Sequence, residues 1–300
     1  MTGSPRPYGP VMALLALILI SGCVPLKTTR VAAVALTMED VAKAALKQSD
    51  PALVREGSPA YLMLLDGLLE AYPDNQRLHL AACQTYASYA ATLPDDAGSQ
   101  ARARLLYLKA RDHGFRALSD DDGSSIRNAA AGDVESFKVF LSHYGQEDVP
   151  ALFWTAAAWG GWIGASTGKP EAVADLPALE AAITRNLELD EAFHYGGPHL
   201  LMAVYLCSKP PVSERQLAQA QTHFQRAFEL GGDQVLAARV MYAENYARGM
   251  KDRRLFESTL QGVIDAPEGQ VPDLTLSNAM AREEARRLLE RTEEFFDGPS

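Results

Sequence analysis

Cysteine is scarce in this chain, with only Cys23, Cys83 and Cys207 among 300 residues. So few thiols exclude the small scaffolds whose stability comes from several disulfides. Cys83 and Cys207 each lie in an apolar helical pattern, 124 positions apart. The sequence does not decide whether these two residues form a disulfide, because it does not establish that they are close in space. We favour two buried thiols that act as small apolar side chains.

Basic residues are also in the minority. The chain has 28 Lys and Arg against 38 Asp and Glu, a formal net charge of −10. An acidic surface disfavours nucleic acid and anionic lipid as partners. Signals for β-structure are equally weak, since runs of β-branched residues are nearly absent and no Asn-Gly pair separates alternating segments. Because Ala and Leu dominate instead, we expect an all-α fold.

The N-terminal apolar run is too short to span a membrane. Val11–Ile20 has ten residues, whereas a spanning helix needs about 20. It follows a stub with one basic residue, Arg6, which is the pattern of a secretory signal peptide. Ile20-Ser21-Gly22-Cys23 then resembles the bacterial lipobox, which predicts that Cys23 is acylated and becomes the mature N-terminus. The alternative is an ordinary secretory signal with a chance cysteine.

These signals predict three parts of the chain: a lipoprotein signal peptide over 1–22, a tether over 23–36 and a single helical repeat domain over 37–297. Removal of the signal peptide leaves 27 basic and 38 acidic residues, a net charge of −11. The protein is expected on the periplasmic side of a bacterial membrane, held there by its N-terminal lipid. Val24 is not the aspartate that signals inner-membrane retention in enteric bacteria, so we favour the outer membrane.

Helix start signals recur along the predicted domain. Thr37-Met38-Glu39-Asp40 resembles a capping box, and Ser58-Pro59 predicts an N-cap followed by proline at the first helical position. Aspartates 120–122 before Gly123 lack the spacing of a calcium loop, so we expect a solvated loop that caps a helix. The predicted helices that bear on the later argument span 41–48, 60–72, 76–93 and about 98–113.

Weak internal repeats point to a stack of helical hairpins. Asn186–Glu191 and Ala227–Gly232 share a central Glu-Leu pair 41 residues apart, each just before a new helix. Ala220, Phe224 and Ala227 have the small–aromatic–small spacing of a tetratricopeptide helix, in which small residues let two helices approach and the aromatic fills the joint. We therefore expect an all-α, helical-hairpin (tetratricopeptide-like) solenoid with degenerate repeats.

Motifs that carry catalysis are missing from the sequence. There is no serine in a nucleophile elbow and no Gly-rich phosphate loop. Among six histidines only His194 and His199 are close, and five positions across Gly196-Gly197-Pro198 do not place them on one helical face. We expect no enzyme, no cofactor and no metal site.

The three tryptophans all fall between Val149 and Gly164, among alanines and glycines. Glycines in a helix suggest close packing or an open surface. Trp154, Trp159 and Trp162 therefore predict either a buried joint between helices or the aromatic wall of a groove. Similarly, the stretch with His194, Tyr195 and His199 predicts either a helix N-terminal turn with Pro198 at its first position or the polar rim of that groove. Our predicted ligand- or partner-binding surface comprises these six residues.

Segments spread over nearly all of the mature chain resemble the T component of TRAP transporters. The segments that carry the resemblance are Tyr107–Leu118, Val149–Gly160, Phe193–Leu200, Tyr242–Arg248 and Leu274–Leu289. The resemblance implies a periplasmic, lipid-anchored protein of cryptic tetratricopeptide-like repeats that associates with the substrate-binding P component. It also implies trimers with a central pore, and it supplies no catalytic residue.

Two classes of function follow. The first is a TRAP accessory protein that binds the P component or passes a small, largely apolar ligand. The second is a general tetratricopeptide-like scaffold lipoprotein for envelope protein assembly, which would hold its partners on a concave surface.

Overall fold

A computed structural model of the protein describes residues 37, 38, 40–94, 96–210, 212–269 and 271–297. These residues contain no strand and are mostly helical, which confirms the predicted all-α class. The described residues from Lys43 onward belong to one compact unit, and those up to Ala42 belong to a separate unit. The predicted signal peptide, tether and acylated Cys23 lie outside the described residues.

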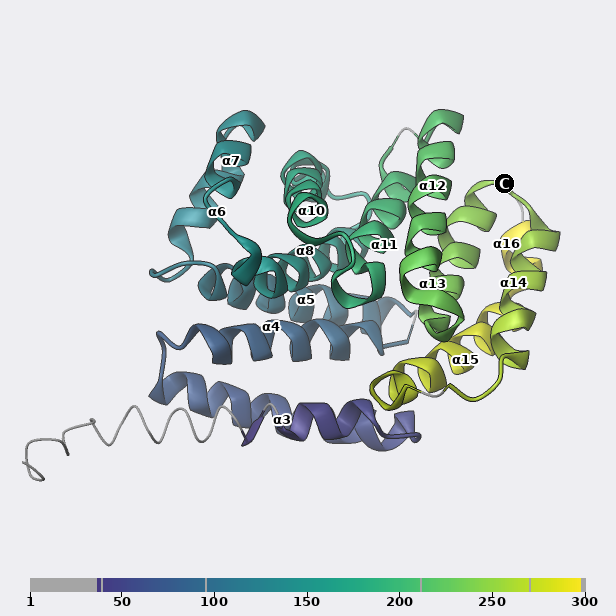
Figure 1. The fold of residues 1–300 in the computed structure, drawn as a ribbon, viewed down its shortest axis with the longest axis horizontal. Coiled ribbons are helices and arrows are strands. Elements are labelled where there is room, and N and C mark those ends of the chain that lie inside the picture. The colour runs from purple at the N-terminus through teal and green to yellow at the C-terminus, as the bar shows by residue number, and fades with distance from the viewer. Residues whose placement is uncertain (1–36, 39, 95, 211, 270, 298–300) are drawn as a thin grey trace, which may run out of the picture. The chain divides into compact units, whose positions relative to one another are not determined.

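Residues 37–38 and 40–46 are helical. The helices that follow, with the labels of Figure 1, are α3 (Pro51–Ala71), α4 (Gln76–Ala91), α5 (Ala97–Ala117), α6 (Ser124–Ala131), α7 (Val134–Leu141), the 3₁₀ turn η1 (Gln146–Asp148), α8 (Val149–Gly164), α9 (Pro170–Ala174), α10 (Leu176–Asp190), α11 (Phe193–Ser208), α12 (Glu214–Gly231), the 3₁₀ turn η2 (Gly232–Gln234), α13 (Leu236–Met241), the π-helix η3 (Tyr242–Ala247), α14 (Arg253–Asp265), the 3₁₀ turn η4 (Pro272–Leu274), α15 (Thr275–Glu290) and α16 (Thr292–Phe296).

Consecutive helices pack as neighbours within the unit that begins at Lys43. The most extensive pairings join α4 to α5 and α11 to α12, and α8 packs against α4, α5, α10 and α11 (Figure 1). The last long helix, α15, also contacts α3, where Arg55 forms an ion pair with Glu283 at 2.9 Å. Pairing of successive helices is what helical hairpins produce, and the tetratricopeptide-like repeat within it stays a prediction.

The predicted small–aromatic–small joint is buried. Ala220, Phe224 and Ala227 lie on one face of α12 with at most 1 % of their surface exposed. The Phe224 ring meets Tyr242 edge-on, with ring centroids 5.2 Å apart. The spacing in the sequence therefore identified a real helix contact surface, because residues three and four apart share a helical face.

One predicted helix boundary is wrong. The sequence places a helix start at Ser58-Pro59, but α3 begins at Pro51 and runs through Pro59. The Asp50 carboxylate caps it by accepting hydrogen bonds from the backbone N–H groups of Ala52 and Leu53. Proline at position 59 removes one helical hydrogen bond, and an interior proline often breaks a helix. Here the helix continues, because its buried face, with Leu62, Leu65 and Leu69, packs on the core.

The expectation of two buried free thiols is confirmed in part. Both cysteines are free thiols, and Cys83 is buried, but Cys207 is only half-buried. Burial raises the pKa of the Cys83 thiol to about 12, so this thiol is unreactive at neutral pH. In the aspartate loop, the Asp121 carboxylate accepts hydrogen bonds from the N–H groups of Gly123 and Ser125, as a loop that caps a helix requires.

Candidate functional site

The six residues predicted to bind a ligand or partner come from two neighbouring helices. They are Trp154, Trp159 and Trp162 on α8, and His194, Tyr195 and His199 at the start of α11. The structure distributes them over three different environments. Two tryptophans lie in the core, Trp154 lies with His194 and Tyr195, and His199 faces α12.

Trp159 and Trp162 belong to the main hydrophobic core, with 2 % and 8 % of their surface exposed. The indole N–H of Trp159 donates to Asp175 Oδ2 at 2.8 Å, and Arg111 Nη1 donates to the same oxygen at 2.9 Å. The Arg111 guanidinium also lies 4.9 Å from the centre of the Trp162 ring. This arrangement joins α5, α8 and the residue that precedes α10, which is the buried joint between helices that the sequence left open.

Trp154 lies in an aromatic cluster at the surface. Its ring centroid is 5.3 Å from that of His194, and the His194 ring is 5.9 Å from Tyr195 and 5.6 Å from Phe153. His194 is exposed, and Trp154 and Tyr195 are half-buried. The apolar rings around the imidazole desolvate it and lower the pKa of His194. Among the described residues, neither imidazole nitrogen of His194 has a hydrogen-bond partner. We call Trp154, His194 and Tyr195 the aromatic surface.

An unusual backbone turn presents the aromatic surface. His194, Tyr195 and Gly196 have φ values of 48°, 61° and 79°, which lie in the left-handed region. Such a conformation costs about 1–3 kcal/mol at a residue other than glycine, and strained residues of this kind cluster at binding and switch sites. We call residues 194–196 the left-handed turn. The right-handed helix resumes at Gly197, so Pro198 falls in its first turn, in agreement with one of the two predicted alternatives.

Close packing on both sides holds the left-handed turn in place. A Cβ atom on Gly197 would lie 2.6 Å from the Phe153 ring of α8, and a Cβ atom on Gly196 would lie 3.2 Å from the Ala227 Cα of α12. A side chain at position 197 would push the Phe153 ring aside, and a side chain at position 196, where φ is positive, would be strained and would press against the α12 backbone. The left-handed turn is therefore packed closely between α8 and α12.

His199 follows the turn and points to α12 rather than to the aromatic surface. Its Nδ1 lies 2.8 Å from His223 Nδ1, and its Nε2 lies 2.9 Å from Glu191 Oε2. Arg226 of α12 forms an ion pair with the same carboxylate. Arg226 and then His199 donate hydrogen bonds that hold the pKa of Glu191 at about 2. His199 thus belongs to a polar cluster on the other side of the turn.

A second histidine pair was not anticipated from the sequence. His79 of α4 and His113 of α5 face each other with an Nδ1–Nδ1 distance of 3.0 Å, and His79 Nε2 donates to the Pro73 carbonyl at 2.8 Å. His79 Nδ1 therefore accepts from His113 Nδ1–H, and His113 Nε2 is buried without a hydrogen-bond partner. The two residues are 34 positions apart, so no local pattern marks the pair.

The His79–His113 pair is expected to make the fold sensitive to acid. Burial, followed by the charges of His79 and Lys109, lowers the pKa of His113 to about 3, whereas the unfolded residue titrates near 6.5. Below pH 6.5 the unfolded chain therefore binds a proton at His113 that the folded chain does not bind. The free energy of unfolding decreases as the pH is lowered from about 6.5 to about 3. Between about pH 7 and 4.5, His113 should account for about 2–3 kcal/mol of the free energy of unfolding that is lost.

Chemical denaturation of His113→Gln at several pH values tests this expectation. Glutamine still offers an N–H group to His79 but does not titrate, so the variant should lose less stability than the wild type on acidification. His143→Gln, at an exposed histidine, should keep the wild-type pH dependence. Equal acid sensitivity of His113→Gln and the wild type would show that the pair does not control it.

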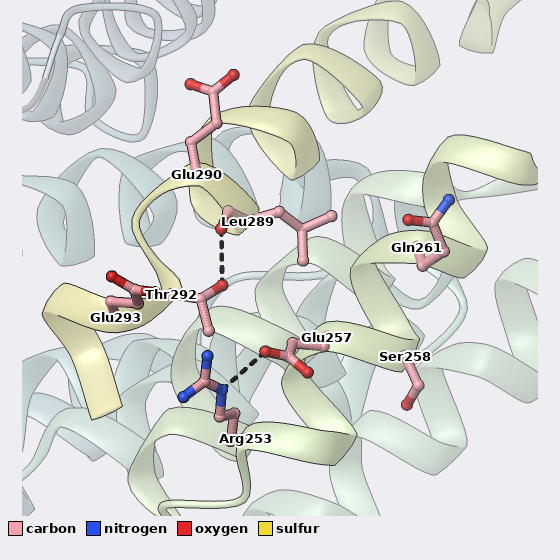
Figure 2. Close-up of a pocket in the computed structure, with 8 residues that line it drawn as sticks. All are labelled: Arg253, Glu257, Ser258, Gln261, Leu289, Glu290, Thr292 and Glu293. Atoms are coloured by element: carbon pink, nitrogen blue, oxygen red, sulfur yellow. Dashed lines mark hydrogen bonds and ion pairs between the residues drawn. The ribbon is translucent and has the colours of Figure 1, made fainter. Parts of the chain in front are cut away.

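Two recesses on the described surface are lined by charged side chains together with polar and apolar ones. One lies between α14, α15 and α16, where Arg253 pairs with Glu257 and the Thr292 hydroxyl donates to the Leu289 carbonyl (Figure 2). Another, lined in part by Asp233, Arg239 and Asn278, lies between η2, α13, α14 and α15. In the described ranges no cluster of three or more His, Cys, Asp or Glu side chains is arranged to hold a metal ion. Likewise, no helix that the structure describes has the length and apolar character needed to cross a membrane.

The family model described as TRAP transporter T-component matches residues 47–296, so it covers α3 to α16 and both sides of the left-handed turn. No curated protein matches the chain.

Proposed function

This chain belongs to the TRAP transporter T-component family, and from that premise we propose that it is a lipid-anchored periplasmic protein that binds the substrate-binding P component. Membership of the family makes the chain an accessory component of a TRAP transporter. The partner, the lipid anchor at Cys23 and the compartment are our proposals, motivated by the signal peptide, the lipobox and the geometry around His194.

The aromatic surface is the observation that carries the proposal. Aromatic side chains dominate the energetics of protein interfaces, because they bury a large area with little loss of conformational freedom. His194 adds a donor and an acceptor without partners among the described residues, which suits it to orient a docked chain. The strained backbone at His194 and Tyr195 places these two side chains beside Trp154, and strained residues of this kind cluster at functional sites.

Substitutions in the aromatic surface should weaken binding of the P component rather than lower the stability of the fold. Trp154→Ala and Tyr195→Ala should each weaken binding of the P component by about 2 kcal/mol or more, which is about 30-fold in Kd. Isothermal titration calorimetry with a TRAP P component from the same organism measures the affinity, and thermal unfolding of the same samples measures stability. Leu105→Ala, at an exposed position of α5, is the control that should bind as the wild type does.

Unchanged binding by these variants would show that the docking site lies elsewhere on the protein. If both aromatic variants bind the P component with wild-type affinity, the aromatic surface is not the docking site. A pull-down from detergent-solubilised membranes addresses the partner itself. Recovery of envelope-assembly proteins without any TRAP component would favour the scaffold function. We rank binding of a small apolar ligand second, because the recesses described above have charged rims.

A further inference from the structure

The outward face of α3 is apolar. The helix lies at one edge of the unit that begins at Lys43, with α4 on its inner side (Figure 1). Its large outward side chains, Leu53, Met63 and Leu64, have 56 %, 75 % and 54 % of their surface exposed. Exposed residues follow one line along this face: Leu53, Gly57, Ala60, Leu64, Gly67 and Ala71. We call these six residues the α3 seam.

The spacing of the α3 seam is that of a contact between two helices. Its members are separated by steps of four and three residues in alternation. Such steps keep a stripe on one side of a helix, and coiled coils use this repeat where two helices meet. The seam contains no polar side chain, yet its two leucines are more than half exposed in the described chain. It therefore has the pattern of a packed surface without a helix packed on it.

The two glycines of the α3 seam favour a close approach by a second helix. Glycine in the interior of a helix costs stability relative to alanine. Gly57 and Gly67 do not have positive φ angles, and a Cβ atom at either position would meet no neighbouring atom within 4 Å. Packing within the chain therefore does not require glycine at these positions. A helix that approaches from outside does, because glycine lets another backbone come close.

The α3 seam is complementary to itself. Suppose that two copies of α3 pack antiparallel about a two-fold axis level with Leu62. Residues equally far from Leu62 on its two sides then face each other, and the facing pairs are Leu53 with Ala71, Gly57 with Gly67, and Ala60 with Leu64. Each leucine lies opposite an alanine, which is the alternation of large and small side chains that close packing requires. Met63 lies beside the axis and would contact Met63 of the second copy.

Charge at the ends of α3 also favours an antiparallel pair. The first turn of α3 holds no acidic side chain, and its last turn holds no basic one. The pairing brings the exposed Glu70 of one copy beside the N-terminal turn of the other, whose backbone N–H groups carry partial positive charge. Glu56 opposes the pairing, because it lies on the same edge as Glu70 of the second copy and about 3 Å from it along the helix axis.

We infer that the α3 seam is a self-docking surface, through which two copies of this chain form a weak two-fold dimer. A helix of 21 residues is about 30 Å long and about 10 Å wide, so the two seams bury roughly 600 Å² in total. Stable complexes bury about 1,200 Å² or more, and smaller interfaces belong to weak or transient complexes. The dimer is therefore reversible. It goes beyond the proposed function and does not depend on it.

Analytical ultracentrifugation of the full chain in density-matched detergent tests the inference. Leu64→Glu should weaken the dimer at least tenfold, because it places a carboxylate against Ala60 of the second copy. Glu56→Gln should strengthen it about fivefold, because it removes a contact between like charges at each end. Leu105→Glu, at an exposed position of α5, is the matched control and should associate as the wild type does. Circular dichroism of each variant checks that the fold is unchanged.

Disulfide cross-linking tests the register of the dimer. A disulfide needs Cα atoms within about 7 Å of each other. A mixture of Ala60→Cys and Leu64→Cys chains should cross-link on oxidation, because the two positions face each other. Either variant alone should cross-link much less, because its own thiols are offset by about 6 Å along the helix axis. Equal cross-linking in the mixture and in the separate variants would overturn the two-fold register.

Monomers at every protein concentration would overturn the inference, and so would a trimer. Equal association of Leu64→Glu and Leu105→Glu would show that copies associate through another surface. If the wild type is monomeric and Leu64→Glu loses affinity for the P component, the α3 seam belongs to that partner and the inference is wrong. None of these results decides the proposed function, because Trp154→Ala and Tyr195→Ala test the aromatic surface separately.

Discussion

Replacing Trp159 with alanine is expected to lower the free energy of unfolding by about 3–5 kcal/mol, the range for a large aromatic removed from a core. The Trp159 ring is 2 % exposed and meets the Phe115 ring edge-on at 5.5 Å. The substitution leaves a cavity between α5 and α8, and it removes the indole donor from Asp175. Urea denaturation of the wild type and the variant measures the loss.

Two further variants separate the contributions to this loss. Trp159→Phe keeps much of the ring but loses one hydrogen bond to the Asp175 carboxylate, which still accepts from Arg111, so it should cost about 1.5–3 kcal/mol, the range for a hydrogen bond to a charged group. Val173→Ala, at an exposed position of α9, should change stability by about 0.5 kcal/mol or less. A stable Trp159→Ala protein that binds the P component poorly would instead place Trp159 in the binding surface.

Replacing Cys23 with serine is expected to remove the protein from the membrane fraction. Serine lacks the thiol that takes up the diacylglycerol, and acyl chains contribute about 0.8 kcal/mol of membrane affinity for each buried CH₂ group. No described helix is suited to span a membrane in their place. Cell fractionation combined with mass spectrometry of the N-terminus distinguishes a soluble product from an unprocessed precursor.

Cys207→Ser is the matched control for this experiment. It removes a half-buried free thiol within α11 and should leave the protein on the membrane. A Cys23→Ser protein that is processed and retained on the membrane as before would show that the anchor lies elsewhere.

Local patterns in the sequence were enough to predict the helical class and several contact surfaces. The start of α4 at Gln76 and the buried stripe of Ala220, Phe224 and Ala227 both follow from helix periodicity and capping, which depend on residues within a few positions of each other. Pro59 shows the limit of this approach. A proline beside a serine predicts a helix start, but α3 continues through Pro59 because the leucines on its other face are packed in the core.

The predicted site was harder to resolve, because α8 is buried on most of its circumference. Trp154, Trp159 and Trp162 lie in one apolar stretch, and helical spacing alone does not tell which of them faces solvent. Their burial depends on what packs opposite each ring. Arg111 and Asp175 cover Trp159, whereas the left-handed turn leaves Trp154 beside an exposed His194. Trp154 and Trp159 therefore have different roles on the same helix.

The sequence alone determined the all-α class and the family, because both depend on segments read in order along the chain, and export and acylation at Cys23 stay predictions from its short N-terminal motifs. Only the tertiary structure brought His79 to His113 and His199 to His223, across 34 and 24 positions. It also produced the positive φ angles of His194 and Tyr195, which neither residue prefers by itself. The physical reason is the same in each case. Helix propensity and apolar periodicity act between near neighbours, whereas hydrogen bonds between helices and strained turns depend on how whole helices pack, α4 on α5 for the first pair and α8, α11 and α12 around the turn.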